Sequence, residues 1–166
     1  MKTTNILIPT DFSLASLEVI PALINQNPGK KYCIVLVNFL GLSDSITELL
    51  MLSRRSRDYE HITQEFMDEC TRLSNEYKSQ IECLQTEFFY GNTVAVFKNY
   101  LEAREIHQIA KLKDHAFIKL TNRSYDPETL LERSKCKLIT LQPYVKPQPV
   151  KVKALDTVEQ LELQQV

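Results

Sequence analysis

The sequence predicts one α/β domain in which five parallel strands form an open sheet with helices on both faces. Short apolar runs alternate along the chain with amphipathic helical segments, which indicates parallel strands joined by right-handed crossovers. The 166 residues suit a single domain, and apolar and charged residues, at 43% and 25%, occur at the frequencies of ordinary globular proteins. We expect the strand order 3-2-1-4-5, with a ligand crevice between the first and fourth strands.

The first two strands are expected at 5–9 and 32–40. The first is an apolar run that ends in proline, and the second is apolar on both faces, as a central parallel strand is. Ser13 has the side chain of an N-cap and predicts a helix that runs to about Asn25. Pro21 lies inside this helix and is expected to kink it, because proline removes one backbone hydrogen bond.

A long helical pattern extends from residue 45 to about residue 80. It starts with the capping-box spacing of Ser45 and Glu48. One helix of this length would measure about 50 Å, so we expect a break within 53–57. The second part carries an apolar stripe, typical of a helix that covers a sheet, formed by Ile62, Phe66, Cys70, Leu73 and Tyr77.

The third strand is expected at 81–89. A helix should begin near Thr93, and the good helix formers in 102–113 predict that it continues through them. The fourth strand is then expected at 116–121. An alternative places it at 106–112, where the alternation of apolar and polar residues is poorer.

The domain is expected to end with a short helix and the fifth strand, and to span residues 1–142. Asp126 as N-cap and Pro127 as first helical residue predict the helix at 129–134, and the strand follows at 137–141. Residues 143–166 form a C-terminal extension, first rich in proline and lysine and then in glutamate and glutamine.

Charge and hydropathy argue against several classes of partner. The net charge is −1, so the chain as a whole does not attract nucleic acid or anionic lipid. A small basic cluster at Arg54, Arg55 and Arg57 is followed at once by acidic residues, which indicates a solvated helix face. No 18-residue apolar run and no secretory signal pattern is present, so we expect no membrane span and a cytoplasmic protein.

Glycine is scarce. The chain has three glycines, at Gly29, Gly41 and Gly91, and none of them lie close together. A P-loop needs two glycines five positions apart and a dinucleotide-binding fingerprint needs three within six positions, so both are excluded. A phosphate site would have to use side chains and helix N-termini.

The cysteines and histidines show no metal-binding or redox spacing. The four cysteines contain no C-x-x-C pair, and Cys33, Cys83 and Cys136 lie in or beside apolar strands, where a free thiol behaves as a small buried apolar group. The three histidines are scattered, and no metal site is expected. No G-x-S-x-G elbow is present, and we expect no enzymatic activity.

Several segments resemble the universal stress proteins. The opening residues 5–13 are similar to the first strand of that family and its P-x-D-x-S type loop, and 36–39 to its second strand. Residues 91–93 fit the glycine before its third helix, and 130–139 resemble its last helix and strand. The likeness covers residues 5–142 and implies the adenine nucleotide alpha hydrolase-like fold.

The same resemblance implies the residues of a nucleotide crevice. Asp11 matches the acid that contacts ribose, although it could equally cap the loop or the first helix. Phe39 falls where the family's backbone contacts adenine. The family's glycine-rich phosphate loop corresponds to 121–127, which contains no glycine. The residues expected around this crevice, functional or vestigial, are Thr10, Asp11, Asn38, Phe39, Asn122, Arg123 and Ser124.

Two functions follow from these residues. The favoured one is a regulatory or interaction module of the stress response that binds no nucleotide cofactor, because phosphate loops depend on close backbone approach. The alternative is an ATP- or AMP-binding protein with a rebuilt site. In it Arg123 neutralises phosphate, Ser124 and Asn122 donate hydrogen bonds and Asp11 holds the ribose.

The resemblance also implies a homodimer. Family members commonly dimerise through the edge formed by the fifth strand, and here 137–142 is apolar and lies at the expected sheet edge. Val150 to Lys153 alternates as a strand, and apolar residues recur at helical spacing from Leu155 to Leu161. We expect this tail to pack on the second subunit of the homodimer; a disordered tail on a monomer is the alternative. The sequence does not identify any other protein partner.

Overall fold

A five-stranded, all-parallel sheet forms the centre of the computed structural model, which describes residues 2–41 and 58–144. The strands are β1 (Thr3–Pro9), β2 (Lys31–Leu40), β3 (Ile81–Tyr90), β4 (Gln108–Leu112) and β5 (Lys137–Leu141), in the order β3-β2-β1-β4-β5. The expected order and parallel pairing are confirmed. Within the described residues, no helix is long and apolar enough to cross a membrane.

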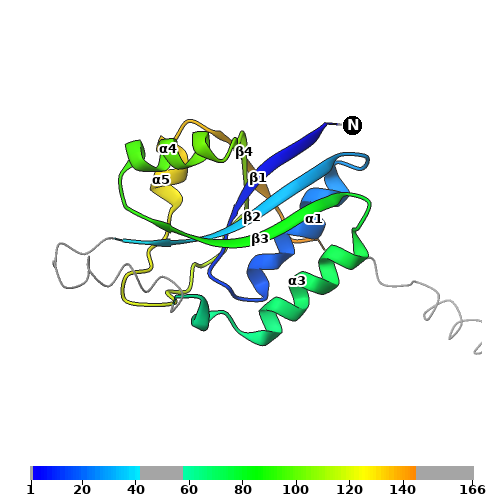
Figure 1. Ribbon diagram of the computed structural model, residues 1–166, viewed down its shortest axis with the longest axis horizontal. Helices are drawn as coiled ribbons and strands as arrows, with labels where there is room; N and C mark the ends of the chain where they lie inside the picture. The colour runs from blue at the N-terminus through cyan, green and yellow to red at the C-terminus, as the bar shows by residue number, and fades with distance from the viewer. Residues whose placement is uncertain (1, 42–57, 145–166) are drawn as a thin grey trace, which may run out of the picture.

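Helices cover both faces of the sheet. A 3-10 turn, η1 (Ala15–Glu18), leads into α1 (Val19–Gln26), and α3 (Gln64–Glu76) lies beside α1 on the same face (Figure 1). The opposite face carries α4 (Val94–Ala103) and α5 (Glu128–Arg133). Residues 42–57 and 145–166 fall outside the described part, and with them the expected capping box, helix break, basic cluster and tail elements.

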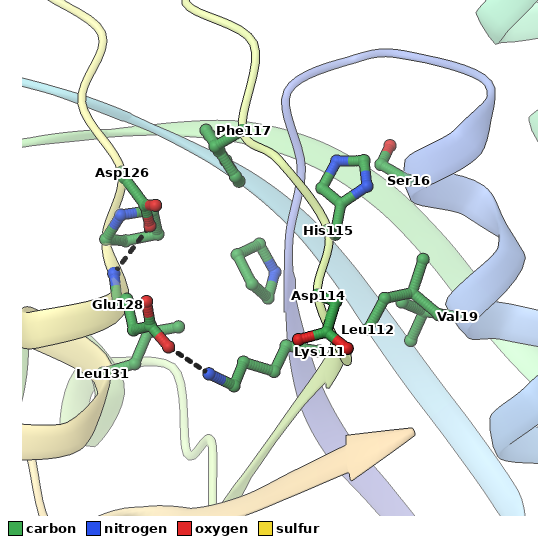
Figure 2. A pocket seen from close by; sticks show the side chains of 12 residues that line it. Ser16, Val19, Lys111, Leu112, Asp114, His115, Phe117, Asp126, Glu128 and Leu131 are labelled. Carbon is green, nitrogen blue, oxygen red and sulfur yellow. Dashed lines mark hydrogen bonds and ion pairs between the residues drawn. The ribbon is translucent and has the colours of Figure 1, made fainter. Parts of the chain in front are cut away.

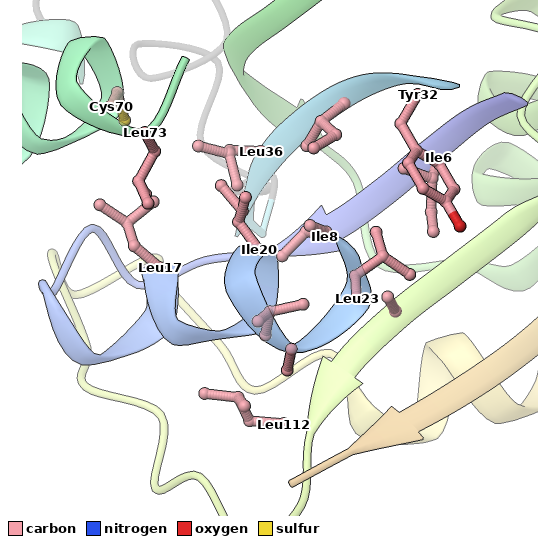
Figure 3. Close-up of a cluster of buried hydrophobic side chains, with 14 of the residues drawn as sticks. Ile6, Ile8, Leu17, Ile20, Leu23, Tyr32, Leu36, Cys70, Leu73 and Leu112 are labelled. Atoms are coloured by element: carbon pink, nitrogen blue, oxygen red, sulfur yellow. The ribbon is translucent and has the colours of Figure 1, made fainter. Parts of the chain in front are cut away.

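Each face has its own apolar core. On the α1 and α3 side, Ile6, Ile8 and Leu36 of the sheet meet Leu17, Ile20 and Leu23 (Figure 3). On the other side, Leu7, Val37 and Phe39 meet Phe97, Leu101 and Leu131. Successive strand residues point to opposite faces, so central strands that serve both cores are apolar throughout. The predicted stripe on α3 is confirmed, with Phe66, Cys70 and Leu73 buried.

The fourth strand lies at Gln108–Leu112, near the alternative of 106–112, so the preferred placement at 116–121 is wrong. The helix expected through 102–113 instead ends at Ala103. Glu105 turns the chain with a φ of +53°, and Ile109 and Ala110 become fully buried in the sheet. Burial between two layers outweighs the helix propensity of this segment.

The first helix differs from its prediction at its start. The chain forms a 3-10 turn before α1 begins at Val19, so Pro21 lies in the first turn of α1. The first-turn N–H groups have no partner within a helix, so proline costs no hydrogen bond there, and the predicted kink is unnecessary. The N-cap of α5 is Pro127, one residue after the expected Asp126, and the helix spans Glu128–Arg133; the Asp126 carboxylate accepts from the Glu128 N–H.

Two cysteines that were expected to be free thiols form a disulfide. Cys33 of β2 and Cys83 of β3 are directly opposite in the strand register, with their Cα atoms 4.6 Å apart. Fifty positions separate them in the sequence, so their proximity arises only when β3 pairs with β2. Cys70 and Cys136 are free, and burial raises the pKa of both thiols.

Candidate functional site: the crevice between β1 and β4

A small crevice opens where β1 and β4 separate. Their register pairs only Ile6 with Gln108 and Leu7 with Ile109, and beyond these pairs the two strands diverge. The resulting cavity has a volume of about 180 Å³, below the roughly 300–1,000 Å³ of typical small-molecule pockets. It lies at the predicted switch point and is lined by Pro9, Ser16, Val19, Lys111, Leu112, Asp114, His115, Phe117, Asp126, Pro127, Glu128 and Leu131 (Figure 2).

Asp11 lies in the turn after β1 and is used by the protein's own chain. Its side chain has an exposed fraction of 0%. One carboxylate oxygen accepts from the backbone N–H and the hydroxyl of Ser13, at 3.0 and 2.5 Å. The other lies 3.0 Å from both Nε2 of His115 and the backbone N of Ile118. Four donors therefore surround the carboxylate.

These donors also set the charge of Asp11. Burial alone would raise its pKa, but the hydrogen bonds from Ser13, Ile118 and His115 more than offset this and lower the pKa below its ordinary value. The carboxylate is therefore ionised and accepts only, so His115 must carry its proton on Nε2 to donate. Asp11 thus joins the β1 turn to the segment 113–119, which follows β4.

The backbone of the same turn is strained and tightly held. Phe12 has a φ of +59°, which is rare for a bulky residue. Its N–H donates to Oγ1 of Thr10, which also lies 2.8 Å from Oγ of Ser16. The Phe12 ring packs against the rings of Phe66 and Phe88. Thr10, a predicted site residue, is completely buried and serves this turn.

The carboxyl end of β2 is covered by residues 123–125, part of the segment that the sequence resemblance aligned with a glycine-rich loop. The Tyr125 N–H donates to the Phe39 carbonyl at 3.2 Å, and the Gly41 N–H donates to the Arg123 carbonyl at 2.8 Å. Leu40 and Ser124 form an antiparallel bridge. The backbone of Phe39, expected to face adenine, therefore hydrogen-bonds to the chain itself, and the Tyr125 ring contacts the Phe39 ring.

The other predicted phosphate ligands also have internal partners or lie outside the cavity. Arg123 pairs with Asp58 at 3.0 Å, and the same carboxylate accepts from the Tyr90 hydroxyl. The buried Ser124 hydroxyl accepts from the Thr121 N–H. Asn122 is exposed and does not line the cavity.

Among the described residues, Asn38 is the predicted site residue that has a buried polar atom without a hydrogen-bond partner. It is fully buried, and its Nδ2 donates to the Thr10 carbonyl at 2.9 Å. Its Oδ1 has no hydrogen-bond partner among the described residues. Asn38 does not line the crevice either, so its amide serves mainly to hold the β1 turn against β2.

The rim of the crevice is acidic. The one lysine or arginine among the described lining residues, Lys111, is paired with Glu128 at 3.0 Å, and Asp114 and Asp126 add two further carboxylates (Figure 2). Pro127 supplies no N–H at the start of α5, and Asp126 already accepts the N–H of Glu128. An anionic phosphate chain would meet net negative charge and few free donors.

Sequence reasoning missed the partners of Asp11. His115 and Ile118 lie in a segment that was assigned to a loop and a strand, and His115 was one of three scattered histidines. Neither residue belongs to a motif, and a distance of over 100 positions separates each from Asp11. The shift of the fourth strand to Gln108–Leu112 is what brings them to this turn.

Comparison with solved structures shows the same fold in a known group of proteins. The universal stress protein UspA from Lactobacillus plantarum is similar over 86% of this chain and 99% of its own, with a TM-score of 0.54 and 17% identity. The hypothetical protein PH0823 is similar over 87% and 99%, with a TM-score of 0.54 and 14% identity. This is the universal stress protein fold. The fold expected from the sequence resemblance is confirmed, and at these identities the likeness extends to the fold alone.

Other comparisons add less. A universal stress protein family protein from Arabidopsis thaliana with AMP bound is similar with a TM-score of 0.47 and 8% identity, which does not indicate a ligand for this chain. No protein-family model matches the chain, and no curated protein matches its sequence.

Proposed function

We propose that this chain is a non-enzymatic regulatory or interaction module with the universal stress protein fold, and that it does not use ATP as a bound cofactor. The observation that carries this proposal is that the chain's own residues occupy the polar groups expected to face a nucleotide. The Asp11 carboxylate accepts hydrogen bonds from His115 and from the Ile118 N–H, and the Phe39 carbonyl accepts one from the Tyr125 N–H.

Opening the crevice for a nucleotide would break these bonds before any were regained. A ribose could reach Asp11 only after His115 and the Ile118 N–H had left it, and adenine could reach the Phe39 backbone only after Tyr125 had moved. Each buried polar group left without a partner costs about 1–3 kcal/mol. The acidic rim adds an electrostatic penalty for the triphosphate.

The assembly we propose is a homodimer through β5. Within the described residues β5 pairs with β4 alone, so its outer edge carries free backbone donors and acceptors. Leu138 and Ile139 are partly buried and Leu141 is buried against the core, which leaves an edge with one charged side chain, Lys137. Exposed edges of this kind are normally paired or masked, and a second copy provides a matching edge.

A thermal-shift screen with ATP, ADP and AMP tests the proposal. A nucleotide at 100 times its dissociation constant would add about 2.7 kcal/mol to the free energy of unfolding. We expect no shift of the unfolding midpoint with any of the three. A concentration-dependent rise with ATP or AMP would instead favour the alternative, a nucleotide site rebuilt around Arg123.

A further inference from the structure

The first half of the β2–β3 pair has one face that no described helix covers. On that face α4 lies over the carboxyl-terminal half of these strands (Figure 1). Its residues Phe97 and Leu101 belong to the apolar core with Val37, Phe39 and Phe89 of the strands. A cavity of about 170 Å³ opens over the first half. Cys33 and Cys83 line it, together with Asn5, Val35, Gln85 and Arg104.

The strand pairing holds the two cysteines together independently of the bond between their sulfur atoms. Cys33 and Cys83 are register partners, and the pairing of β2 with β3 continues from them to Leu40 and Tyr90. Their Cα separation of 4.6 Å lies within the range of disulfides. Reduction would therefore leave two neighbouring thiols that can close again.

The pair is also accessible, unlike Cys70. Cys33 and Cys83 are each half-buried and border an open cavity, whereas Cys70 is buried in the core between α3 and the sheet. Arg104 is the one charged residue that lines this cavity, although its guanidinium also pairs with Glu87 on β3. Neutral and cationic neighbours do not repel an incoming thiolate or the carboxylates of a small peptide thiol.

We propose that Cys33 and Cys83 form a reversible thiol–disulfide exchange site that reacts with low-molecular-weight thiols and disulfides through this cavity. In the closing direction, one cysteine thiolate attacks a small disulfide, forms a mixed disulfide and releases one small thiol. The second cysteine then attacks the mixed disulfide, forms the Cys33–Cys83 bond and releases the second small thiol. Two protein thiols are oxidised and one small disulfide is reduced to two thiols.

The fold can tolerate both states. A chain of 166 residues buries enough apolar surface to fold without a covalent link. Neither Cys33 nor Cys83 belongs to either of the two apolar cores. Reduction therefore removes the covalent link between β2 and the start of the edge strand β3, and it leaves the strand pairing and the apolar cores in place.

Equilibration of the full chain in glutathione buffers, from fully reduced to fully oxidised, tests the site. After an acid quench and alkylation, intact mass and peptide mapping report which of the four cysteines are free. We expect Cys33 and Cys83 to lose alkylation together across the series while Cys70 and Cys136 stay alkylated. A pair that never joins, or a bond that opens only after the protein is denatured, would overturn the proposal.

Matched variants identify the sulfur atoms. Cys70→Ser and Cys136→Ser should leave the transition unchanged. Cys33→Ser and Cys83→Ser should each abolish it, and the remaining cysteine should take up one glutathionyl group in oxidised buffer. If neither single variant takes up glutathione while its circular dichroism spectrum matches the wild type, small thiols do not reach the cavity and the proposal is wrong.

Discussion

Asp11 connects the turn after β1 to the segment after β4 through a buried carboxylate with four donors. Asparagine at this position would keep one oxygen acceptor, but its NH2 group would replace the other oxygen and face groups that are themselves donors. The internal role accounts for the residue without a ligand. The sequence alone left this role and ribose binding equally open, because both need an acid after the first strand.

Asp11→Asn should therefore destabilise the protein by about 3 kcal/mol, since hydrogen bonds to a buried charged group are lost and donors are left unpaired. Urea unfolding followed by circular dichroism measures this change. Asp114→Asn is the matched control, because Asp114 lies in the same segment but is exposed, and it should change stability by no more than about 0.5 kcal/mol. Equal effects of the two substitutions would contradict the role given to Asp11.

The stability that Asp11 contributes should depend on pH in a defined direction. Its pKa is lowered in the folded protein, so the unfolded chain takes up the proton first as the pH falls. The contribution is fully present above the ordinary aspartate pKa of about 3.9 and is lost as the pH falls through the lower folded value. The difference between the wild type and Asp11→Asn should shrink over this acid range. If the stability difference between the two proteins stays constant from neutral pH down to about pH 2, the charge of the Asp11 carboxylate is not the source of the stabilisation.

At the scale of elements, four strands were predicted within a few residues and one was misplaced. β1, β2 and β5 contain apolar runs, β3 ends in one, and turn-forming residues lie beside these strands, so composition locates them. β4 has five residues, includes Lys111 and follows a helix that ends without glycine. Glu105 and Asp114 take the positive φ that glycine usually supplies, at +53° and +59°. The usual signals for both ends of β4 are therefore missing from the sequence.

Amide hydrogen exchange distinguishes the two positions of the fourth strand. The amides of Ile109 to Leu112 should be strongly protected, because this segment pairs with β5 and with β1. In 116–120, only the Ile118 N–H should be slow, since it donates to Asp11. Continuous protection across 116–121 with fast exchange in 109–112 would restore the strand position that the sequence favoured.

At the scale of the whole molecule, the alternation of strands and helices predicted a parallel sheet, and the order 3-2-1-4-5 was expected because it is a common arrangement in open sheets of this kind. The internal hydrogen bonds of Asp11 and of the Phe39 carbonyl were not predictable in the same way. They depend on contacts between the turn after β1, the end of β2 and the segment after β4, which lie far apart in sequence and carry no shared motif. The missing glycines excluded a glycine-rich phosphate loop, but they did not indicate which residues of the chain contact Asp11 and Phe39.

The proposed dimer is a prediction at this same scale. Light scattering on the full chain should give the mass of two subunits, and Thr140→Lys should shift the protein toward monomer, because it places a charge at an exposed position of β5. Lys119→Glu, at an exposed position away from β5, is the control for a charge change and should leave the mass unchanged. A monomeric full chain at all concentrations would contradict the dimer.

Calorimetric titration of the full chain with magnesium and ATP is the most direct test of the occupied crevice. Asp11 and the Phe39 carbonyl are already bound by the protein, so we predict no heat of binding at ATP concentrations up to about 1 mM, the level that corresponds to only about 4 kcal/mol of binding free energy. Saturable binding with a dissociation constant in the micromolar range, weakened by Arg123→Ala, would show that the segment 115–125 yields to the nucleotide and would contradict the account.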